Sequence, residues 1–189
     1  LEGMAGVEAA GKGLHQSDVE FDHVFSSDSG RTLQTSRIVL EQLKKQQLEV
    51  TLEPRLREFN FGLFEGGAEN HLLDAVSKSV NVEPERFYDL DESFRIMTNF
   101  VAAENLKQVN APYLGDIEDC EKYCQRLEAG VQSIVEKLQG VGGGKALIIS
   151  HGMTIATIIQ HLSPQSVLPK TWIPNASLTK IIWSDGAYN

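Results

Sequence analysis

Cysteine is scarce in this sequence, and long apolar runs are absent. Its 189 residues include only two cysteines, Cys120 and Cys124, which excludes both a disulfide framework and a complete zinc site. No apolar run approaches the roughly 20 residues that are needed to cross a bilayer. These absences lead us to expect a cytoplasmic protein.

Positive charge is also in short supply. The chain carries 17 Lys and Arg against 26 Asp and Glu, which gives a formal net charge of −9 and a pI of about 5.0. Such a field repels nucleic acid and anionic membrane surfaces, so we expect neither as a partner. A small phosphorylated substrate remains compatible, because a few arginines and helix amino ends can form a local positive pocket. The only other partner we consider is a second copy of the chain, in a homodimer.

The pattern of predicted elements indicates an α/β domain. Helices are predicted over 4–14, from about 30 to 44, over 117–138 and over 153–162, and strands over 21–25, 50–52, 146–149 and 179–183. This alternation favours a three-layer α/β/α sandwich, in which a mostly parallel sheet has helices on both faces. We expect one domain over 1–189, because the chain is short for two.

A helical insertion is predicted between about residues 68 and 114. It contains helical pieces over 71–78 and 94–103, which are separated by Pro84, and it ends near Pro112. We interpret it as a cap over a site. The two cysteines lie on the apolar face of the helix predicted over 117–138, where a core role explains them.

One histidine stands where open α/β sheets carry out chemistry. His151 follows the apolar run 146–149, and Gly152 comes next, just where a helix begins. The glycine permits a ligand to approach the backbone, and the helix adds amide donors. A purely structural histidine would also fit this position.

An arginine occupies a similar corner after the first predicted strand. The segment 26–32 reads Ser-Ser-Asp-Ser-Gly-Arg-Thr and places Arg31 in the first turn of a helix, where a cation is disfavoured unless a bound anion offsets the cost. The planar guanidinium can hold two phosphate oxygens at once. A solvated or salt-bridged surface arginine is the alternative.

Two carboxylates lie among aromatic residues and glycines in the segment 56–66. Apolar surroundings raise the pKa of a carboxyl group and make it a usable proton donor near neutral pH, so Glu58 or Glu65 could serve. Both could instead cap a turn or pair with neighbouring arginines. The other histidines are interpreted as surface or capping residues: His15, His23, His71 and His161. We expect no metal, because no spacing of His, Cys and Asp supplies three convergent ligands.

Together these segments resemble the histidine phosphatase superfamily, which contains phosphoglycerate mutases and many small phosphatases. The resemblance is carried, in order along the chain, by the helix approach 2–14, the segment 26–35, the loop 56–66, Ser-His-Gly at 150–152 and Asn-Ala-Ser at 175–177. It implies that Arg31 clamps the transferred phosphoryl group and that His151 stabilises its charge. It also implies that Glu58 donates a proton to the leaving oxygen, with Glu65 ranked behind it, and that Arg31 and Gly152 bind substrate.

The family's nucleophile is missing from the sequence. It belongs to an Arg-His-Gly motif at the end of the family's first strand, and no Arg-His-Gly occurs here. We expect this strand and its histidine upstream of Leu1. The alternatives are a noncatalytic relative that binds a phosphorylated ligand or a partner, and a fold in which another chain supplies the strand.

The function that follows from the resemblance is phosphoryl transfer. The complete protein is expected to be a phosphatase that acts on a small phosphorylated metabolite through a phosphohistidine, and phosphoglycerate mutase is the alternative. We favour a phosphatase because the insertion is short and acidic. The hydrolase needs no cofactor, whereas a mutase would need a bisphosphate primer.

Overall fold

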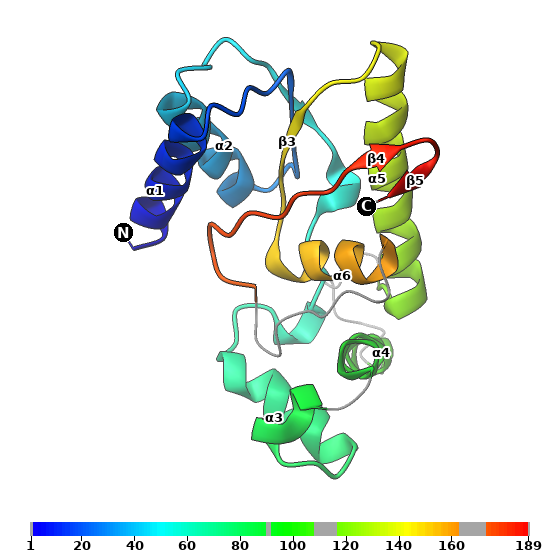
Figure 1. The fold of residues 1–189 in the computed structure, drawn as a ribbon. Helices are drawn as coiled ribbons and strands as arrows, with labels where there is room; N and C mark the ends of the chain where they lie inside the picture. Colours follow the sequence, from blue (N-terminus) through cyan, green and yellow to red (C-terminus); the bar gives the residue numbers. More distant parts are fainter. Residues whose placement is uncertain (1, 90–91, 108–116, 163–172, 189) are drawn as a thin grey trace. The chain divides into compact units, whose positions relative to one another are not determined.

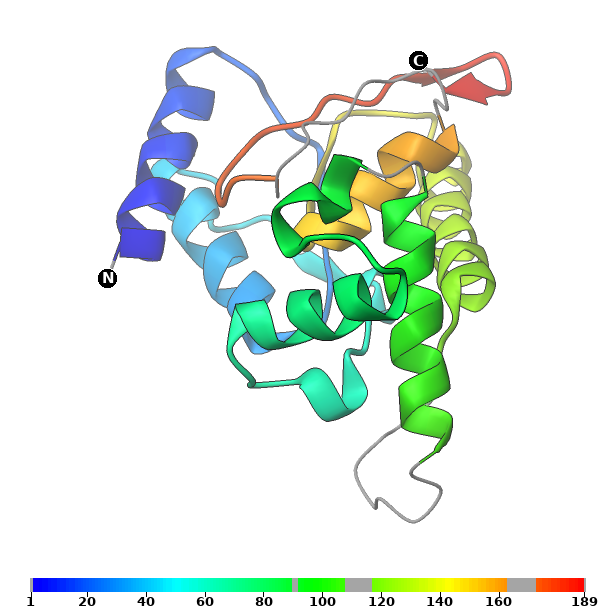
Figure 2. The ribbon, with the colours of Figure 1, turned by 90° about the horizontal axis from the view of Figure 1, so that it is seen from below.

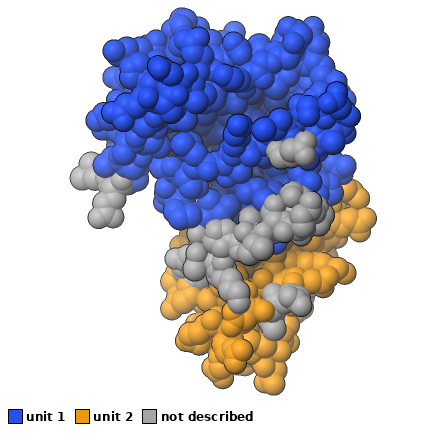
Figure 3. All heavy atoms as spheres, in the orientation of Figure 1, with its two compact units in different colours: residues 1–58, 126–189 blue, residues 59–125 orange. Residues whose placement is uncertain are grey.

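The computed structural model describes residues 2–89, 92–107, 117–162 and 173–188. The chain forms two compact units, one made of residues 1–58 and 126–189 and the other of residues 59–125 (Figure 3). The predicted insertion at about 68–114 falls within the second unit, although residues 108–114 lie outside the described part of the chain.

The first unit contains a parallel sheet of three short strands. These are β1 (His23–Ser26), β2 (Val50–Leu52) and β3 (Ala146–Ile149), in the order β2-β1-β3. Val24 pairs with both Val50 and Leu147, so these three side chains share one face of the sheet. Both neighbours of β1 run parallel to it, which confirms the predicted α/β fold with a mostly parallel sheet.

One face of this sheet is covered by the first two helices. Buried Val24, Leu147 and Ile149 form a core with Val39 and Leu40 of α2 (Gly30–Gln42). The helix α1 (Glu2–Gln16) lies alongside α2 in both views (Figures 1 and 2). A Cβ atom added to Gly11 would lie 2.8 Å from Cβ of Gln42, so this glycine permits the close approach of the two helices.

The opposite face meets the long helix α5 (Cys120–Gly140). The ammonium group of Lys137 lies 5.8 Å from the ring centroid of Phe25, whose side chain points away from the face that carries Val24. Helices therefore cover both faces, as the alternating pattern predicts. The two cysteines are free thiols, and both are partly buried.

The second unit is built from short helices around aromatic side chains. It contains α3 (Glu69–Ser79), α4 (Ser93–Leu106) and the 3₁₀ segments Gly62–Phe64 and Pro84–Asp89. Tyr123, from the first turn of α5, is fully buried, and its ring lies 5.3 Å from that of Phe59 in an edge arrangement. The predicted helical pieces 71–78 and 94–103 correspond to α3 and α4.

The last predicted strand is largely wrong. Residues 179–182 have no strand structure, and only Trp183 begins a two-residue strand, β4 (Trp183–Ser184), which pairs antiparallel with β5 (Ala187–Tyr188). A strand requires backbone partners, and in the described part of the chain no strand lies against 179–182. Ile181 and Ile182 are 44% and 46% exposed as a result.

Candidate active site

Two loops meet at the carboxyl ends of the adjacent strands β1 and β3. Ser26 is paired with Ile149, so the residues that follow each strand are neighbours. The amide of Ser27 donates a hydrogen bond to the carbonyl of Ile149 at 3.0 Å. This register brings the loop that carries Arg31 to the loop that carries His151.

Arg31 and His151 are in direct contact. Nε of Arg31 donates a hydrogen bond to Nδ1 of His151 at 2.9 Å. A ring nitrogen that accepts a hydrogen bond carries no proton, so the neutral imidazole holds its proton on Nε2. That nitrogen lies 3.0 Å from Oγ of Ser27, which is fully buried.

The surroundings of His151 favour its neutral form. His151 is only 6% exposed. Burial in the first place, and then the positive charges of Arg31 and Arg126, lower its pKa from 6.5 to about 4. The negative charge of Asp28 acts in the opposite direction. At neutral pH the ring is therefore uncharged and can donate a hydrogen bond through Nε2.

The first turn of α2, which carries Arg31, is anchored by the next residue, Thr32. Oγ1 of Thr32 donates to the carbonyls of Ser27 and Ser29 at 2.7 and 2.8 Å. Ser29 is the N-cap residue of this helix, but its side chain makes no capping hydrogen bond. The anchored turn leaves the Arg31 side chain at the amino end of the helix.

Glu58 lies at the amino end of α6 (Gly152–Leu162). Its carboxylate accepts hydrogen bonds from the amides of Met153 and Thr154 at 3.2 and 3.0 Å, and from Oγ1 of Thr154 at 3.0 Å. Gly152 is the first residue of this helix and directly follows His151. The structure therefore assembles Arg31, His151, Gly152 and Glu58 within one unit, from three separate loops.

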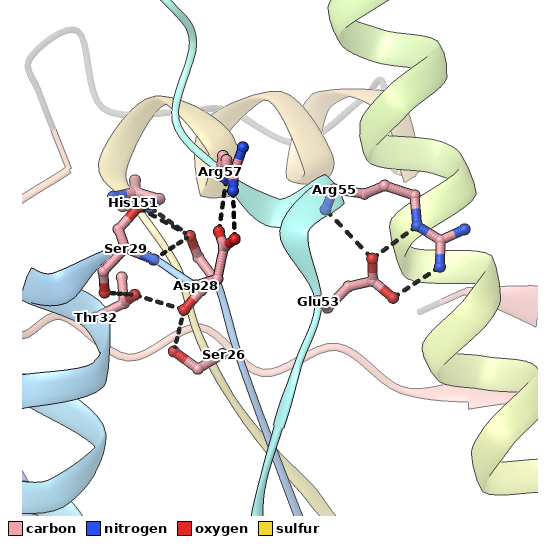
Figure 4. A network of polar contacts seen from close by, with 9 residues as sticks. Ser26, Asp28, Ser29, Thr32, Glu53, Arg55, Arg57 and His151 are labelled. Atoms are coloured by element: carbon pink, nitrogen blue, oxygen red, sulfur yellow. Dashed lines mark hydrogen bonds and ion pairs between the residues drawn. The ribbon is translucent and has the colours of Figure 1, made fainter.

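An ion pair that the sequence analysis missed joins two of these loops. The guanidinium of Arg57 binds the carboxylate of Asp28 through both oxygens, with Nε at 2.6 Å from Oδ1 and Nη2 on Oδ2 (Figure 4). The hydrogen bond from Arg57 holds the pKa of Asp28 below its usual value. The sequence gives only a weak indication of this ion pair. Asp28 and Arg57 each lie close to a candidate site residue, but their spacing in the chain does not predict that they interact.

Two further residues tie the segment before Glu58 in place. Nη1 of Arg126, on α5, donates to the carbonyls of Arg55 and Arg57 at 2.6 and 3.0 Å. Oγ1 of Thr154 donates to the Arg57 carbonyl at 3.1 Å. Sequence reasoning missed both contacts, because these carbonyl groups belong to residues that lie far away along the chain.

Glu65 makes a local hydrogen bond. It lies in the second unit, where its carboxylate accepts a hydrogen bond from the amide of Phe61 at 3.0 Å. This contact matches the capping role that the sequence analysis left open for it. Among the weaker histidines, His161 pairs with Glu128 at 3.6 Å on an exposed surface.

Neither a metal nor a membrane is indicated by the described residues. They contain no group of three or more His, Cys, Asp or Glu side chains that could hold a metal ion. Across the same ranges, every helix is too short or too polar to span a bilayer. The cluster is instead rich in donors that suit an anion: a guanidinium, an imidazole and helix amides.

Comparison with known proteins defines the class to which this fold and cluster belong. The model of the histidine phosphatase superfamily (branch 1) matches residues 1–189, and the chain belongs to this family. The crystal structure of a phosphoglycerate mutase from Bacillus anthracis is 32% identical, with a TM-score of 0.85, and the match covers 100% of this chain and 78% of that one.

Other relatives are more distant and more varied. A probable phosphoglycerate mutase, GpmB, of Yersinia pestis is 24% identical over 168 residues, which are 88% of this chain and 65% of that protein. The α-ribazole phosphatase of Shigella flexneri is 20% identical, with a TM-score of 0.57 over 96% of this chain and 78% of that one, and shares the fold. The chain thus spans less than two thirds of the length of the curated relatives that it matches.

Proposed function

We propose that the complete protein is a phosphatase that hydrolyses a small phosphorylated metabolite through a phosphohistidine. The observation that carries the proposal is the contact between Arg31 and His151, 2.9 Å apart at the ends of two parallel strands, with Glu58 at the adjacent helix terminus. Membership of the histidine phosphatase superfamily supports phosphoryl transfer as the reaction class. Transfer of this kind depends on positioning and on electrostatic stabilisation, which cations and amide donors provide.

Each residue of the cluster has a role in this reaction. Arg31 binds two oxygens of the phosphoryl group with its guanidinium fork. Neutral His151 donates from Nε2 to a third oxygen, and the negative charge of that group favours a protonated ring as charge develops. Glu58 gives its proton to the oxygen of the leaving alcohol. The amide of Gly152 adds a donor at the amino end of α6.

The nucleophile is proposed to come from a segment upstream of Leu1. The sequence contains no Arg-His-Gly, the motif that carries the nucleophile in the family that it resembles. The sheet offers room for a further strand, because β3 has a described strand partner on one edge only and Ile148, in this strand, is 45% exposed. A strand from the upstream segment, lying parallel to β3, would end beside His151.

The proposed reaction has two balanced steps. In the first, the upstream histidine nitrogen forms a bond to phosphorus, the bond between phosphorus and the alcohol oxygen breaks, and that oxygen takes the proton of Glu58. In the second, water forms a bond to phosphorus, the nitrogen–phosphorus bond breaks, and the Glu58 carboxylate takes the proton of the water. Inorganic phosphate leaves and the site returns to its starting state.

Phosphoglycerate mutase activity is the second candidate function. The similarity to the Bacillus anthracis structure, which is described as a phosphoglycerate mutase, favours it. We favour a phosphatase because the insertion at about 68–114 is short and its sequence is acidic at Glu83, Glu85, Asp89, Asp91 and Glu92. Release of phosphate from a panel of sugar phosphates and phosphoglycerates, compared with isomerisation of phosphoglycerate after a bisphosphate primer is added, separates the two activities.

The proposal is tested with the full-length protein. We expect phosphate release that falls at least a hundredfold in the Arg31→Ala and His151→Ala variants, because each removes a donor to the transferred group. Unchanged rates in both variants would overturn the enzyme proposal. Saturable binding of phosphate or vanadate without any turnover would instead favour a noncatalytic relative.

A further inference from the structure

Arg57 is held by contacts of both its side chain and its main chain. Its guanidinium makes a two-point ion pair with Asp28, in the loop between β1 and α2. Its carbonyl accepts hydrogen bonds from Thr154, in the first turn of α6, and from Arg126 of α5. The residue thus joins the segment 54–58 to three other parts of the first unit: the loop after β1, the first turn of α6 and α5.

The residue that follows is Glu58, whose placement depends on these contacts. The backbone leaves a 3₁₀ turn (Pro54–Leu56) and becomes extended at Arg57, with φ −59° and ψ 153°. The Glu58 carboxylate then reaches the amides of Met153 and Thr154. A shift of residue 57 would therefore move the carboxylate along the helix terminus, and displacement of a reacting group by about 1 Å can cost on the order of a hundredfold in rate.

Arg31 is fixed by different contacts. Its helical turn is tied to the end of β1 through Thr32, which donates to Ser27 and Ser29, and its side chain rests on His151. None of these bonds involves Arg57. Loss of the Arg57 guanidinium should therefore displace Glu58, the proposed proton donor, more than Arg31, the proposed phosphate ligand.

We propose that the Arg57–Asp28 ion pair is the positioning device for Glu58, which it holds where it can protonate the leaving oxygen. Arg57 acts through Glu58 and does not itself touch the substrate. This inference rests on the proposed function, because it assigns the ion pair to the proton-transfer step of that reaction.

A defect in proton donation has a distinctive dependence on the leaving group. An alkyl phosphate must receive a proton as its oxygen departs, whereas 4-nitrophenyl phosphate releases a stable anion that leaves without one. The parameter to compare is kcat/KM, which reports the first step and excludes later hydrolysis of the phosphohistidine. In the full-length protein, we expect Arg57→Met and Asp28→Asn to lower kcat/KM at least tenfold more for an alkyl phosphate than for 4-nitrophenyl phosphate.

A double-mutant cycle shows whether Arg57 acts through Glu58. If it does, Arg57→Met should cause little further loss of kcat/KM for the alkyl phosphate once Glu58→Gln is present. Arg57→Lys, which keeps the charge but not the fork, should recover part of the loss. The matched control is Lys45→Met, which breaks the exposed ion pair with Glu20 and should change neither substrate's kcat/KM.

The outcomes are separable. Equal losses for both substrates, or losses that multiply in the double variant, would overturn the positioning role and leave the proposed function standing. Failure of the unsubstituted full-length protein to release phosphate from either substrate would overturn the proposed function and this inference with it. Thermal unfolding of each variant identifies any loss of activity that comes from loss of the fold.

Discussion

Arg31 and His151 share one hydrogen atom, which Nε of the arginine donates to Nδ1 of the histidine at 2.9 Å. A protonated imidazole has no lone pair on Nδ1, so this contact and a charged ring exclude each other. The pair is therefore compatible only with neutral His151. Binding of a phosphate dianion would shift the protonation equilibrium of His151 towards the charged ring, because the negative charge of the phosphate offsets the positive charge of the guanidinium.

The neutral state of His151 should make the stability of the chain sensitive to acid. Its pKa is about 4 in the folded state, against 6.5 for an ordinary histidine, so between these values the unfolded chain binds more protons than the folded one. The contribution to stability is complete above pH 6.5 and is lost as the pH falls towards 4, with an upper limit of about 3 kcal/mol. Urea unfolding at pH 7 and pH 5 measures it.

The control for this experiment is His151→Gln, which removes the titrating group. Other acidic and histidine side chains also titrate in this range, so the informative quantity is the difference in slope between the two proteins. The variant should lose less stability than the unsubstituted chain between pH 7 and pH 5. Parallel pH profiles would show that His151 has an ordinary pKa in the folded state.

Arg31 should dominate the affinity for phosphate. It is the arginine that contacts His151, and replacing its side chain with a methyl group removes a two-point ligand for the anion. We expect Arg31→Ala to weaken phosphate or vanadate binding to the full-length protein at least tenfold, measured by calorimetry. Arg31→Lys should restore only part of the affinity, because an ammonium group lacks the planar fork.

Arg37 provides a matched control on the same helix. It is exposed and lies well along α2 from the amino end, so Arg37→Ala removes the same charge from the same element. Its effect on affinity should stay within about twofold, since exposed charges at a distance are largely screened. Equal losses in both variants would mean that net charge, and not the site, determines binding.

The amino end of α6 should be stabilised by Glu58. The carboxylate accepts two amides and the hydroxyl of Thr154, so Glu58→Ala leaves these donors without that partner and should cost about 1 kcal/mol of unfolding free energy. Glu58→Gln keeps one acceptor oxygen and should cost less. Glu41→Ala, on the exposed side of α2, is the control and should fall within about 0.5 kcal/mol of the parent.

The sequence predicted the parts of the fold that have a strong local pattern. The sheet strands 50–52 and 146–149 and the helices around them have clear apolar periodicity, and the corners at Arg31 and His151 follow from the rule that parallel strands place their carboxyl ends together. The contact of Arg31 with His151 also needed the register that pairs Ser26 with Ile149. Strand register depends on how two distant segments pair, so it could not be predicted from either segment alone.

Other features depend on partners distant in sequence, and the sequence analysis missed them. The segment 179–183, predicted as a strand, contains β-branched residues, but a residue's preference for β structure forms no strand without a neighbouring backbone. The Arg57–Asp28 pair links residues 29 positions apart in the chain. The role of Arg126 is harder still to predict, because it donates to the carbonyl oxygens of Arg55 and Arg57, and every residue carries such an oxygen.

The outer edge of β3 tests the proposal that an upstream segment completes the sheet. Ile148 is 45% exposed in the 189-residue chain, so Ile148→Lys should cost little there, within about 1 kcal/mol. If an upstream strand covers this edge in the full-length protein, the same substitution would bury an ammonium group against apolar neighbours and cost at least about 2 kcal/mol more. The adjacent Leu147, 9% exposed on the opposite face, is the control, because Leu147→Lys should destabilise both proteins strongly. Urea unfolding of the two substitutions in both chain lengths gives the comparison, and an equally small cost of Ile148→Lys in each would show that no strand lies against this edge.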